Sequence, residues 1–200
     1  MELYPNRKLL QLIAQDPSNI LLVKDSLITP QMWRYAIEQD PALFQYIRNP
    51  SPDICEFAVS ESGENLKWVR ESNPEAITSE MCYRAIDSYP LAILYVPSEL
   101  CDYAMKEYAI DLDPTLIQAF TDLRPGYIQE KLRADPSFCR FLKNPTEDME
   151  YRAVENDANY CAYVRHFTPR IKGLIRTLYP EIIPLLPNFN KPEESEEDYI

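Results

Sequence analysis

The sequence has little glycine, almost no histidine and fewer basic than acidic residues. Its 3 glycines stand alone at positions 63, 126 and 173, so it has no glycine-rich phosphate loop of the Rossmann or P-loop type. One histidine, His166, cannot build a histidine-rich metal site. The 20 basic and 32 acidic residues give a net charge of -12. This balance argues against a bulk nucleic-acid or anionic-membrane surface, although a local basic strip is still compatible with it.

The sequence also lacks long apolar runs and cysteine pairs. No run reaches the length that a bilayer requires, and the first residues lack the basic and apolar regions of a secretory signal. The 5 cysteines are odd in number, and no two have CxxC spacing. We therefore expect reduced thiols and a cytoplasmic protein, in its own cell or in an infected host cell.

Proline is abundant, with 18 residues, and an internal repeat explains where it falls. A small or apolar reference residue recurs at intervals of 24, 22, 27, 24, 22, 22 and 22 residues, and five of the eight are alanine. The eight reference residues are Leu12, Ala36, Ala58, Ala85, Ala109, Lys131, Ala153 and Ile175. The reference residue, the next residue and the residue four before it form one apolar face of a helix.

The fifth residue after the reference, position +5, marks a turn within each repeat. Six of the eight residues at this position are proline, and five of the preceding residues are aspartate, as in Asp16-Pro17 and Asp40-Pro41. An aspartate caps free N–H groups at a helix start, and proline fits the first helical position. The same proline prevents the preceding helix from continuing. Each repeat is therefore predicted to be helix, Asp-Pro turn, helix.

The second helix of each repeat is predicted to bury positions +8, +10 and +11. Position +8 holds residues such as Ile20 and Phe44, and position +10 holds Tyr46, Trp68, Tyr95 and Tyr163, which we expect in the core. Period-2 alternation is absent, and this density of proline would break a β-ladder, so strands are excluded. Neither helix is long enough to be stable alone, so neighbouring repeats must stack.

These patterns predict an all-α fold, an α-solenoid of about eight repeats. The predicted repeats span residues 5–27, 28–50, 51–76, 77–96, 97–121, 122–145, 146–167 and 168–188 within an array of residues 1–190. The long third interval predicts a longer loop around Glu71–Glu75, and a second possible opening at Pro97 predicts a first helix about a turn longer in the fifth repeat. Residues 191–200 carry one base and five acids and are predicted to form an acidic disordered tail.

Segments 29–37 (TPQMWRYAI) and 51–59 (SPDICEFAV) resemble a family of short, two-helix repeats. The family pattern is approximately T-P-E-x-C-x-x-A-V, a glycine turn and A-L-x-Y-V, and it occurs in phage, giant-virus and bacterial proteins of largely unknown function. The second, third, fourth and seventh repeats match best. The turn departs from the pattern, because Asp-Pro replaces glycine. The resemblance implies a helical array and a viral or bacterial source, and it transfers no catalytic residue.

Residues that could carry chemistry have simpler structural interpretations. Cys55 and Cys82 share one position of the repeat, and Cys139 and Cys161 occupy position +8, where other repeats have isoleucine, leucine or phenylalanine, so we predict buried thiols. His166 follows Arg165 at a helix end, where a cation suits the helix dipole. The helix dipole also explains why cations occur at position +12, at the end of the second helix. The alternative interpretation is that these cations form a basic strip that binds an acidic partner or a phosphate backbone. These cations are Lys24, Arg48, Arg70, Lys143 and Arg165.

The sequence therefore favours a non-enzymatic protein-binding adaptor or inhibitor that needs no cofactor or metal. Repeat arrays bind macromolecules over extended surfaces, and exposed aromatic and arginine residues in the middle repeats are the expected anchors. These anchors are Arg34, Tyr35, Arg48, Arg70 and Tyr83. Two alternatives stay open: an acidic decoy that mimics nucleic acid, and a nucleic-acid binder that uses the position +12 cations.

Overall fold

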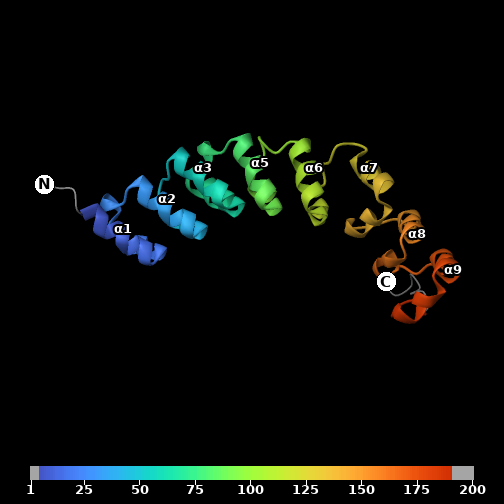
Figure 1. Cartoon of the computed structure of the whole chain (residues 1–200). Coiled ribbons are helices and arrows are strands. Elements are labelled where there is room, and N and C mark those ends of the chain that lie inside the picture. Colours follow the sequence, from blue (N-terminus) through green and yellow to red (C-terminus); the bar gives the residue numbers. More distant parts are fainter. Residues whose placement is uncertain (1–4, 191–200) are drawn as a thin grey trace, which may run out of the picture. The chain divides into compact units, whose positions relative to one another are not determined.

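The computed structural model describes residues 5–190, and every regular element in that range is helical. Contacts divide the chain into two compact units, Met1–Asp113 and Pro114–Ile200. The α-helices are α1 (Pro5–Gln15), α2 (Pro30–Gln39), α3 (Pro52–Glu61), α4 (Leu66–Ser72), α5 (Ser79–Ser88), α6 (Tyr103–Leu112), α7 (Tyr127–Ala134), α8 (Glu147–Asn156) and α9 (Pro169–Leu178). Short helices packed in tandem confirm the predicted all-α class (Figure 1).

The second segment of most repeats is a 3₁₀-helix rather than an α-helix. These segments are η1 (Pro17–Leu22), η3 (Pro41–Tyr46), η4 (Gly63–Asn65), η6 (Pro90–Tyr95), η7 (Pro114–Ala119), η8 (Pro136–Phe141), η9 (Ala158–Tyr163) and η10 (Pro180–Leu185). Two further 3₁₀ turns are η2 (Asp25–Leu27) and η5 (Pro74–Ala76). Six of the segments begin at the proline of position +5, so the predicted turn is confirmed.

Side-chain caps fix both helix starts of a repeat. At the 3₁₀ segments, an aspartate carboxylate accepts the N–H two residues ahead, as Asp40 does from Ala42 (3.1 Å). At the α-helices, a hydroxyl accepts the N–H three residues ahead, as Thr29 does from Met32 (3.3 Å). The same aspartate caps occur at Asp16, Asp135 and Asp157, and the same threonine caps at Thr78, Thr146 and Thr168. Each cap satisfies a backbone donor that a short helix would leave free.

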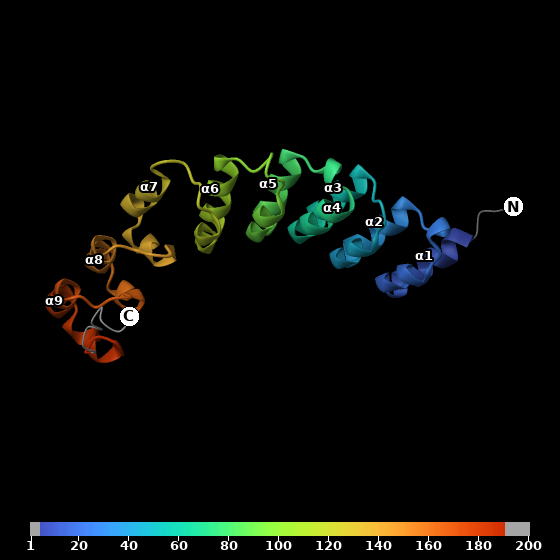
Figure 2. The same ribbon diagram turned by 180° about the vertical axis from the view of Figure 1, so that it is seen from behind.

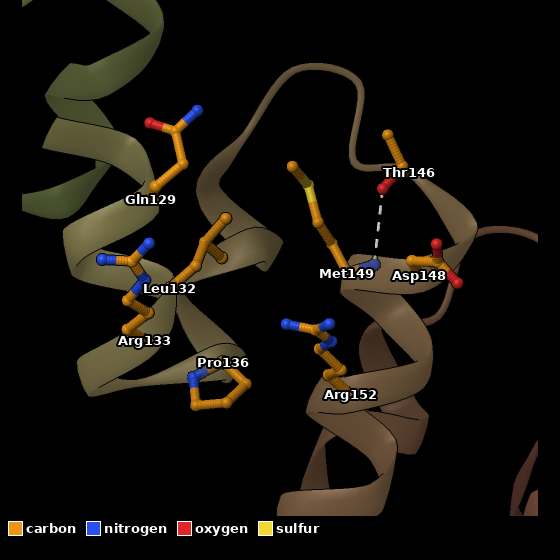
Figure 3. Close-up of a pocket in the computed structure, with 8 residues that line it drawn as sticks. All are labelled: Gln129, Leu132, Arg133, Pro136, Thr146, Asp148, Met149 and Arg152. Carbon is orange, nitrogen blue, oxygen red and sulfur yellow. Dashed lines mark hydrogen bonds between the residues drawn. The ribbon is translucent and has the colours of Figure 1, made fainter. Parts of the chain in front are cut away.

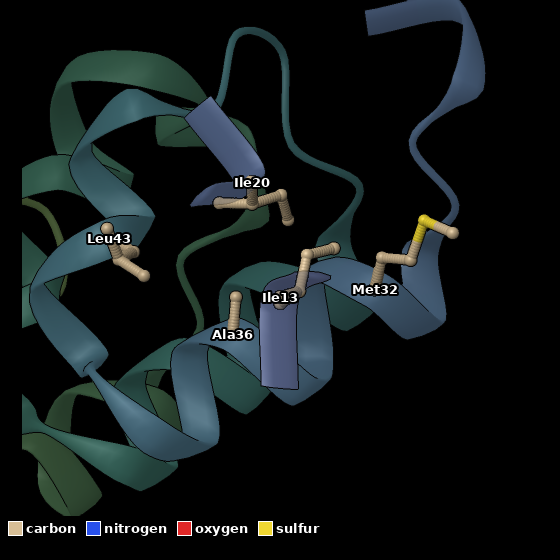
Figure 4. Close-up of a cluster of buried hydrophobic side chains, with 5 residues drawn as sticks. All are labelled: Ile13, Ile20, Met32, Ala36 and Leu43. Atoms are coloured by element: carbon tan, nitrogen blue, oxygen red, sulfur yellow. The ribbon is translucent and has the colours of Figure 1, made fainter. Parts of the chain in front are cut away.

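The core of the first unit lies between the α-helices and the 3₁₀ segments. Figure 4 shows its first cluster, where Ile13, Ile20, Met32, Ala36 and Leu43 meet. The segment η1 packs against both α1 and α2, and η6 packs against both α5 and α6. The four reference alanines of this unit are fully buried, which lets successive α-helices approach closely.

Successive α-helices of the first unit lie side by side in Figures 1 and 2, and side chains pair between them. Each pair joins two consecutive repeats. One partner lies two residues before the reference residue of its repeat, and the other lies one residue before the reference residue of the next repeat. The Arg34 guanidinium stacks over the Phe57 ring at 4.9 Å from its centroid. Arg84 Nη1 lies 3.2 Å from Glu56 Oε1. The rings of Tyr83 and Tyr108 meet edge to face at 5.8 Å. The pairs differ chemically but tie consecutive repeats at the same place.

The second unit buries a polar cluster between η8, α8 and η9. Cys139 Sγ donates to Tyr160 Oη at 2.9 Å, and both side chains are buried. Burial and this hydrogen bond raise the pKa of the Tyr160 hydroxyl. The buried Glu150 carboxylate accepts the Arg165 backbone N–H at 3.0 Å. These bonds satisfy polar groups that would otherwise be costly to bury.

Two predicted irregularities are wrong. The extra residues of the third repeat do not form a loop: they extend its second segment into α4 and add the turn η5. The first helix of the fifth repeat is not extended by a turn, because α6 has 10 residues, as α2, α3, α5, α8 and α9 do, and begins after Asp102, which caps the Met105 N–H at 2.8 Å. The cap fixes the start of this helix, so the segment at Pro97 stays a separate turn. The predicted tail lies outside the described residues.

Candidate functional site: an aromatic and basic edge

Position +10 of the repeats is exposed, which corrects its predicted place in the core. Its side chains form what we call the aromatic edge: Leu22, Tyr46, Trp68 and Tyr95 in the first unit, and Ala119, Phe141, Tyr163 and Leu185 in the second. The side chains of Leu22 and Tyr46 are 79% and 54% exposed, and Trp68 and Tyr95 are partly exposed. Consecutive repeats of the first unit therefore present large apolar groups to solvent.

The geometry of the 3₁₀-helix explains this exposure. Three residues complete a turn, so positions +8 and +11 lie on one line, whereas position +10 falls a third of a turn away. Position +8 is buried in seven repeats, with Ile20 and Cys139 of the 3₁₀ segments at 0% exposure, and position +11 is buried directly after such segments at Val96 and Leu142. An α-helical period instead spreads the apolar stripe wide enough to include position +10. The 3₁₀ segments thus direct Tyr46, Tyr95, Phe141 and Tyr163 away from the buried line, whereas Trp68 lies in the α-helix α4.

Cations accompany the aromatic side chains along this edge. Lys67 Nζ lies 4.5 Å from the centre of the Trp68 ring. In the second unit, Arg140 lies 4.6 Å from the Phe141 ring and 5.3 Å from the Tyr163 ring, so one guanidinium bridges two consecutive repeats. Such contacts keep aromatic faces and positive charge adjacent at the surface.

Two cations at position +12 bind carbonyl groups of a neighbouring repeat. Arg70 Nη1 donates to the Leu94 carbonyl at 3.4 Å, at the end of η6. Arg165 Nη2 donates to the Leu142 carbonyl at 2.7 Å, and its Nη1 donates to the Lys143 carbonyl. These cations therefore bind carbonyl groups near the C-terminal end of a helix, as the helix dipole predicts. The helix belongs to a neighbouring repeat, however, and not to the repeat of the cation. Lys24, Arg48 and Lys143 are exposed at the equivalent positions.

A cavity of about 250 Å³ opens beside the aromatic edge in the first unit. Ile20, Val23, Ile28 and Trp33 supply apolar walls. The cavity is also lined by Leu21, Asp25, Tyr46 and Arg48. Because the cavity is lined by Tyr46 of the aromatic edge and by Arg48, a bound side chain would contact both.

The structure does not bring the five predicted anchors together. Arg48 follows η3 and Arg70 lies in α4, and each comes two residues after a member of the aromatic edge. The other three lie on α-helices and contact neighbouring repeats: Arg34 stacks on Phe57, Tyr83 meets Tyr108, and Tyr35 packs half-buried against the first core cluster. The aromatic members of the edge were missed because an α-helical period was assumed. A three-residue period from the +5 proline is the signal that would have found them.

The cysteines lie where their repeat positions predict. Cys55, Cys82, Cys139 and Cys161 are buried, and Cys101 is half-buried. Burial raises the pKa of the Cys55 and Cys82 thiols to about 11, so both carry their proton at neutral pH. His166 is exposed in the segment between η9 and α9, three residues after η9 ends. Among residues 5–190, no group of three or more histidine, cysteine or acidic side chains is placed to hold a metal ion.

Comparisons with known proteins identify no relative of this chain. No family model, no curated protein and no solved structure matches it. Within residues 5–190, no helix combines the length and the apolar character that crossing a bilayer requires.

Proposed function

We propose that this chain is a non-enzymatic protein-binding module, an adaptor or inhibitor, whose contact surface is the aromatic edge of its first unit. One observation carries the proposal: consecutive repeats expose Leu22, Tyr46, Trp68 and Tyr95, with Lys24, Arg48 and Arg70 close in sequence to them. Position +8 of the same segments is buried, and the exposed Leu21 and Leu94 add apolar surface next to Leu22 and Tyr95.

The energetics of burial support a protein partner. A tyrosine or tryptophan side chain buries about 150–250 Å² on contact, and apolar area contributes about 25 cal/mol per Å². Two aromatic side chains can therefore contribute several kcal/mol before the costs of association. Tryptophan, tyrosine and arginine are also the residue types that dominate binding energy at interfaces.

The chemistry of the edge favours a partner segment that combines apolar and acidic side chains. An apolar side chain fits the cavity beside Tyr46, and carboxylates fit Arg48 and Lys24. Single-stranded nucleic acid also binds aromatic and cationic surfaces. A net charge of -12 opposes its approach, and Arg70 already donates to a carbonyl, so we favour a protein. A decoy that mimics nucleic acid would use the acidic side chains instead.

The test compares two variants as baits in the native host extract. Tyr46→Ala/Trp68→Ala removes two members of the edge, and Tyr103→Ala removes a similarly exposed tyrosine from the α6 helix. We expect a partner to bind the wild type and Tyr103→Ala equally and the double variant at least about 30-fold more weakly, as for loss of a hot spot of about 2 kcal/mol. Circular dichroism should show unchanged helicity in all three.

Two outcomes would contradict the proposal. The first is a partner that binds the double variant as tightly as the wild type. The second is binding of random-sequence RNA or DNA in a mobility-shift assay, lost in the double variant, which would assign the edge to nucleic acid. A decoy that mimics nucleic acid is distinguished by partner binding that weakens steeply as salt is raised and that is unchanged in the double variant.

A further inference from the structure

The second unit contains a groove between α7 and α8, far in sequence from the proposed binding edge. Its volume is about 330 Å³. Leu132 and Pro136 line it from the α7 side and Met149 from the α8 side, and all three are half-buried (Figure 3). Figure 3 shows Leu132 and Met149 directed into the space between the helices. An apolar floor that solvent can reach is a site for an apolar side chain.

A change at the reference position accounts for the groove. In α8 this residue is the fully buried Ala153, but in α7 it is the long, half-buried Lys131. A lysine cannot occupy the space of the alanine that lets α-helices approach closely. The residues that would pair between the two helices are Gln129 and Arg152, and both line the groove. The groove is therefore a consequence of the sequence of the sixth repeat.

The groove carries positive charge although the chain is acidic. Arg133 lies on the α7 side and Arg152 on the α8 side, and both are exposed. Asp148 is the one acid lining the groove, and its carboxylate is paired with Arg170 outside the lining. This pairing also lowers the pKa of Asp148, which keeps the ion pair formed at neutral pH. Arg133 also acts on the nearby Glu130 and Arg152 on Asp148, whose pKa values they lower, and both exposed guanidinium groups can meet carboxylates that enter the groove.

We propose that residues 191–200 of this chain bind in the α7–α8 groove. The segment reads KPEESEEDYI: its acids match Arg133 and Arg152, and Tyr199 and Ile200 match the apolar floor. It contains five acids and one base, so its net charge of -4 is opposite to that of the arginine rim. The binding is intramolecular, and any external segment with the same acidic and apolar chemistry must compete with it.

The end of the described chain belongs to the same compact unit as the groove. Phe189 is buried against Phe167, with ring centroids 5.6 Å apart. The next residue, Thr168, donates its hydroxyl to Glu147 Oε1 at 2.6 Å, and Glu147 adjoins Asp148 in the groove wall. Two side-chain contacts thus connect Phe189 to the α8 side of the groove. From there, ten extended residues can span up to about 33 Å.

Methyl NMR of the methionines tests the proposal in the whole chain. Met149 lines the groove, whereas Met32, Met81 and Met105 are buried in the first unit. We compare the full chain with a chain that ends at Asn190. The Met149 methyl resonance should shift on truncation while those of the three buried methionines do not. A synthetic peptide of residues 191–200, added to the truncated chain, should move the Met149 resonance back toward its original position.

Charge reversal provides the matched variants. Arg133→Glu/Arg152→Glu in the full chain should move the Met149 resonance to its position in the truncated chain and should weaken peptide binding at least tenfold. Arg7→Glu, a reversal at an exposed arginine on α1 of the first unit and outside the groove, should leave both unchanged. Peptide affinity should also fall as NaCl is raised, because the contacts are charged.

Either of two results overturns the proposal. If truncation leaves the Met149 resonance unchanged, the segment does not occupy the groove. If the Met149 shift depends on protein concentration, the occupant is a second copy of the chain. Circular dichroism of the truncated chain checks that the helices are retained, and the charge-reversal comparison in the full chain does not depend on truncation.

Discussion

At the scale of single residues, the turn at Gly63 depends on the absence of a Cβ atom. It occupies the position where six repeats have proline, and its N–H donates to Ser88 Oγ at 3.0 Å. A Cβ at this position would lie 2.2 Å from the Ala85 carbonyl oxygen and 2.6 Å from Ser88 Oγ. The third repeat therefore needs glycine because α5 packs against its backbone. The repeat pattern alone marks the position as an exception without giving this reason.

Two glycine substitutions with opposite expected effects test this packing. Gly63→Ala should lower the free energy of unfolding by about 1–3 kcal/mol, because the added methyl group overlaps backbone atoms that cannot move easily. Gly173→Ala should raise it by up to about 1 kcal/mol, because this residue lies inside α9 with open space around it and alanine is the better helix former. Urea unfolding followed by circular dichroism measures both. A neutral Gly63→Ala would show that the close contact does not limit packing.

At the scale of elements, the aspartate caps define where each second segment begins. Asp40 accepts the Ala42 N–H at the start of η3, immediately before Pro41. Asp40→Ala should cost about 1 kcal/mol of stability, since it leaves a donor at the helix start without its cap. Asp40→Asn should cost far less, because the amide oxygen can accept the same hydrogen bond. The comparison uses urea midpoints. Equal losses in the two variants would mean that charge, and not capping, is the stabilising factor.

The local chemistry of these caps explains why the element order was predictable. Aspartate, proline and threonine act within three residues of their position, so sequence spacing predicted both helix starts of a repeat. The type of the second segment was not predictable in the same way. A six-residue segment is too short to distinguish periods of 3 and 3.6 residues, so Tyr46 and Tyr163 were placed in the core although both are about half exposed. The aromatic edge was missed for this reason, whereas Arg48 and Arg70 were found because charge marks a surface independently of the helix type.

At the scale of the whole molecule, buried cysteines are distributed over both units. Cys55 and Cys82 lie in the first unit, and Cys139 and Cys161 lie in the second. In a repeat array each repeat contacts mainly its neighbours, so local opening can occur in one part without the rest. The rate at which each buried thiol reacts therefore reports local opening of the repeat that contains it.

Thiol titration measures how accessible the five cysteines are in the folded and in the unfolded chain. The native chain at pH 8 should react rapidly with about one equivalent of a thiol reagent, at the half-buried Cys101, and slowly at the other four cysteines. All five should react after denaturation without reductant. Because burial holds the pKa of Cys55 and Cys82 at about 11, the folded state keeps protons that the unfolded chain releases above about pH 9. Stability should therefore fall as the pH rises from 9 to 11. Fewer than five reactive thiols after denaturation, with a mass loss of two hydrogens, would reveal a disulfide and contradict the prediction.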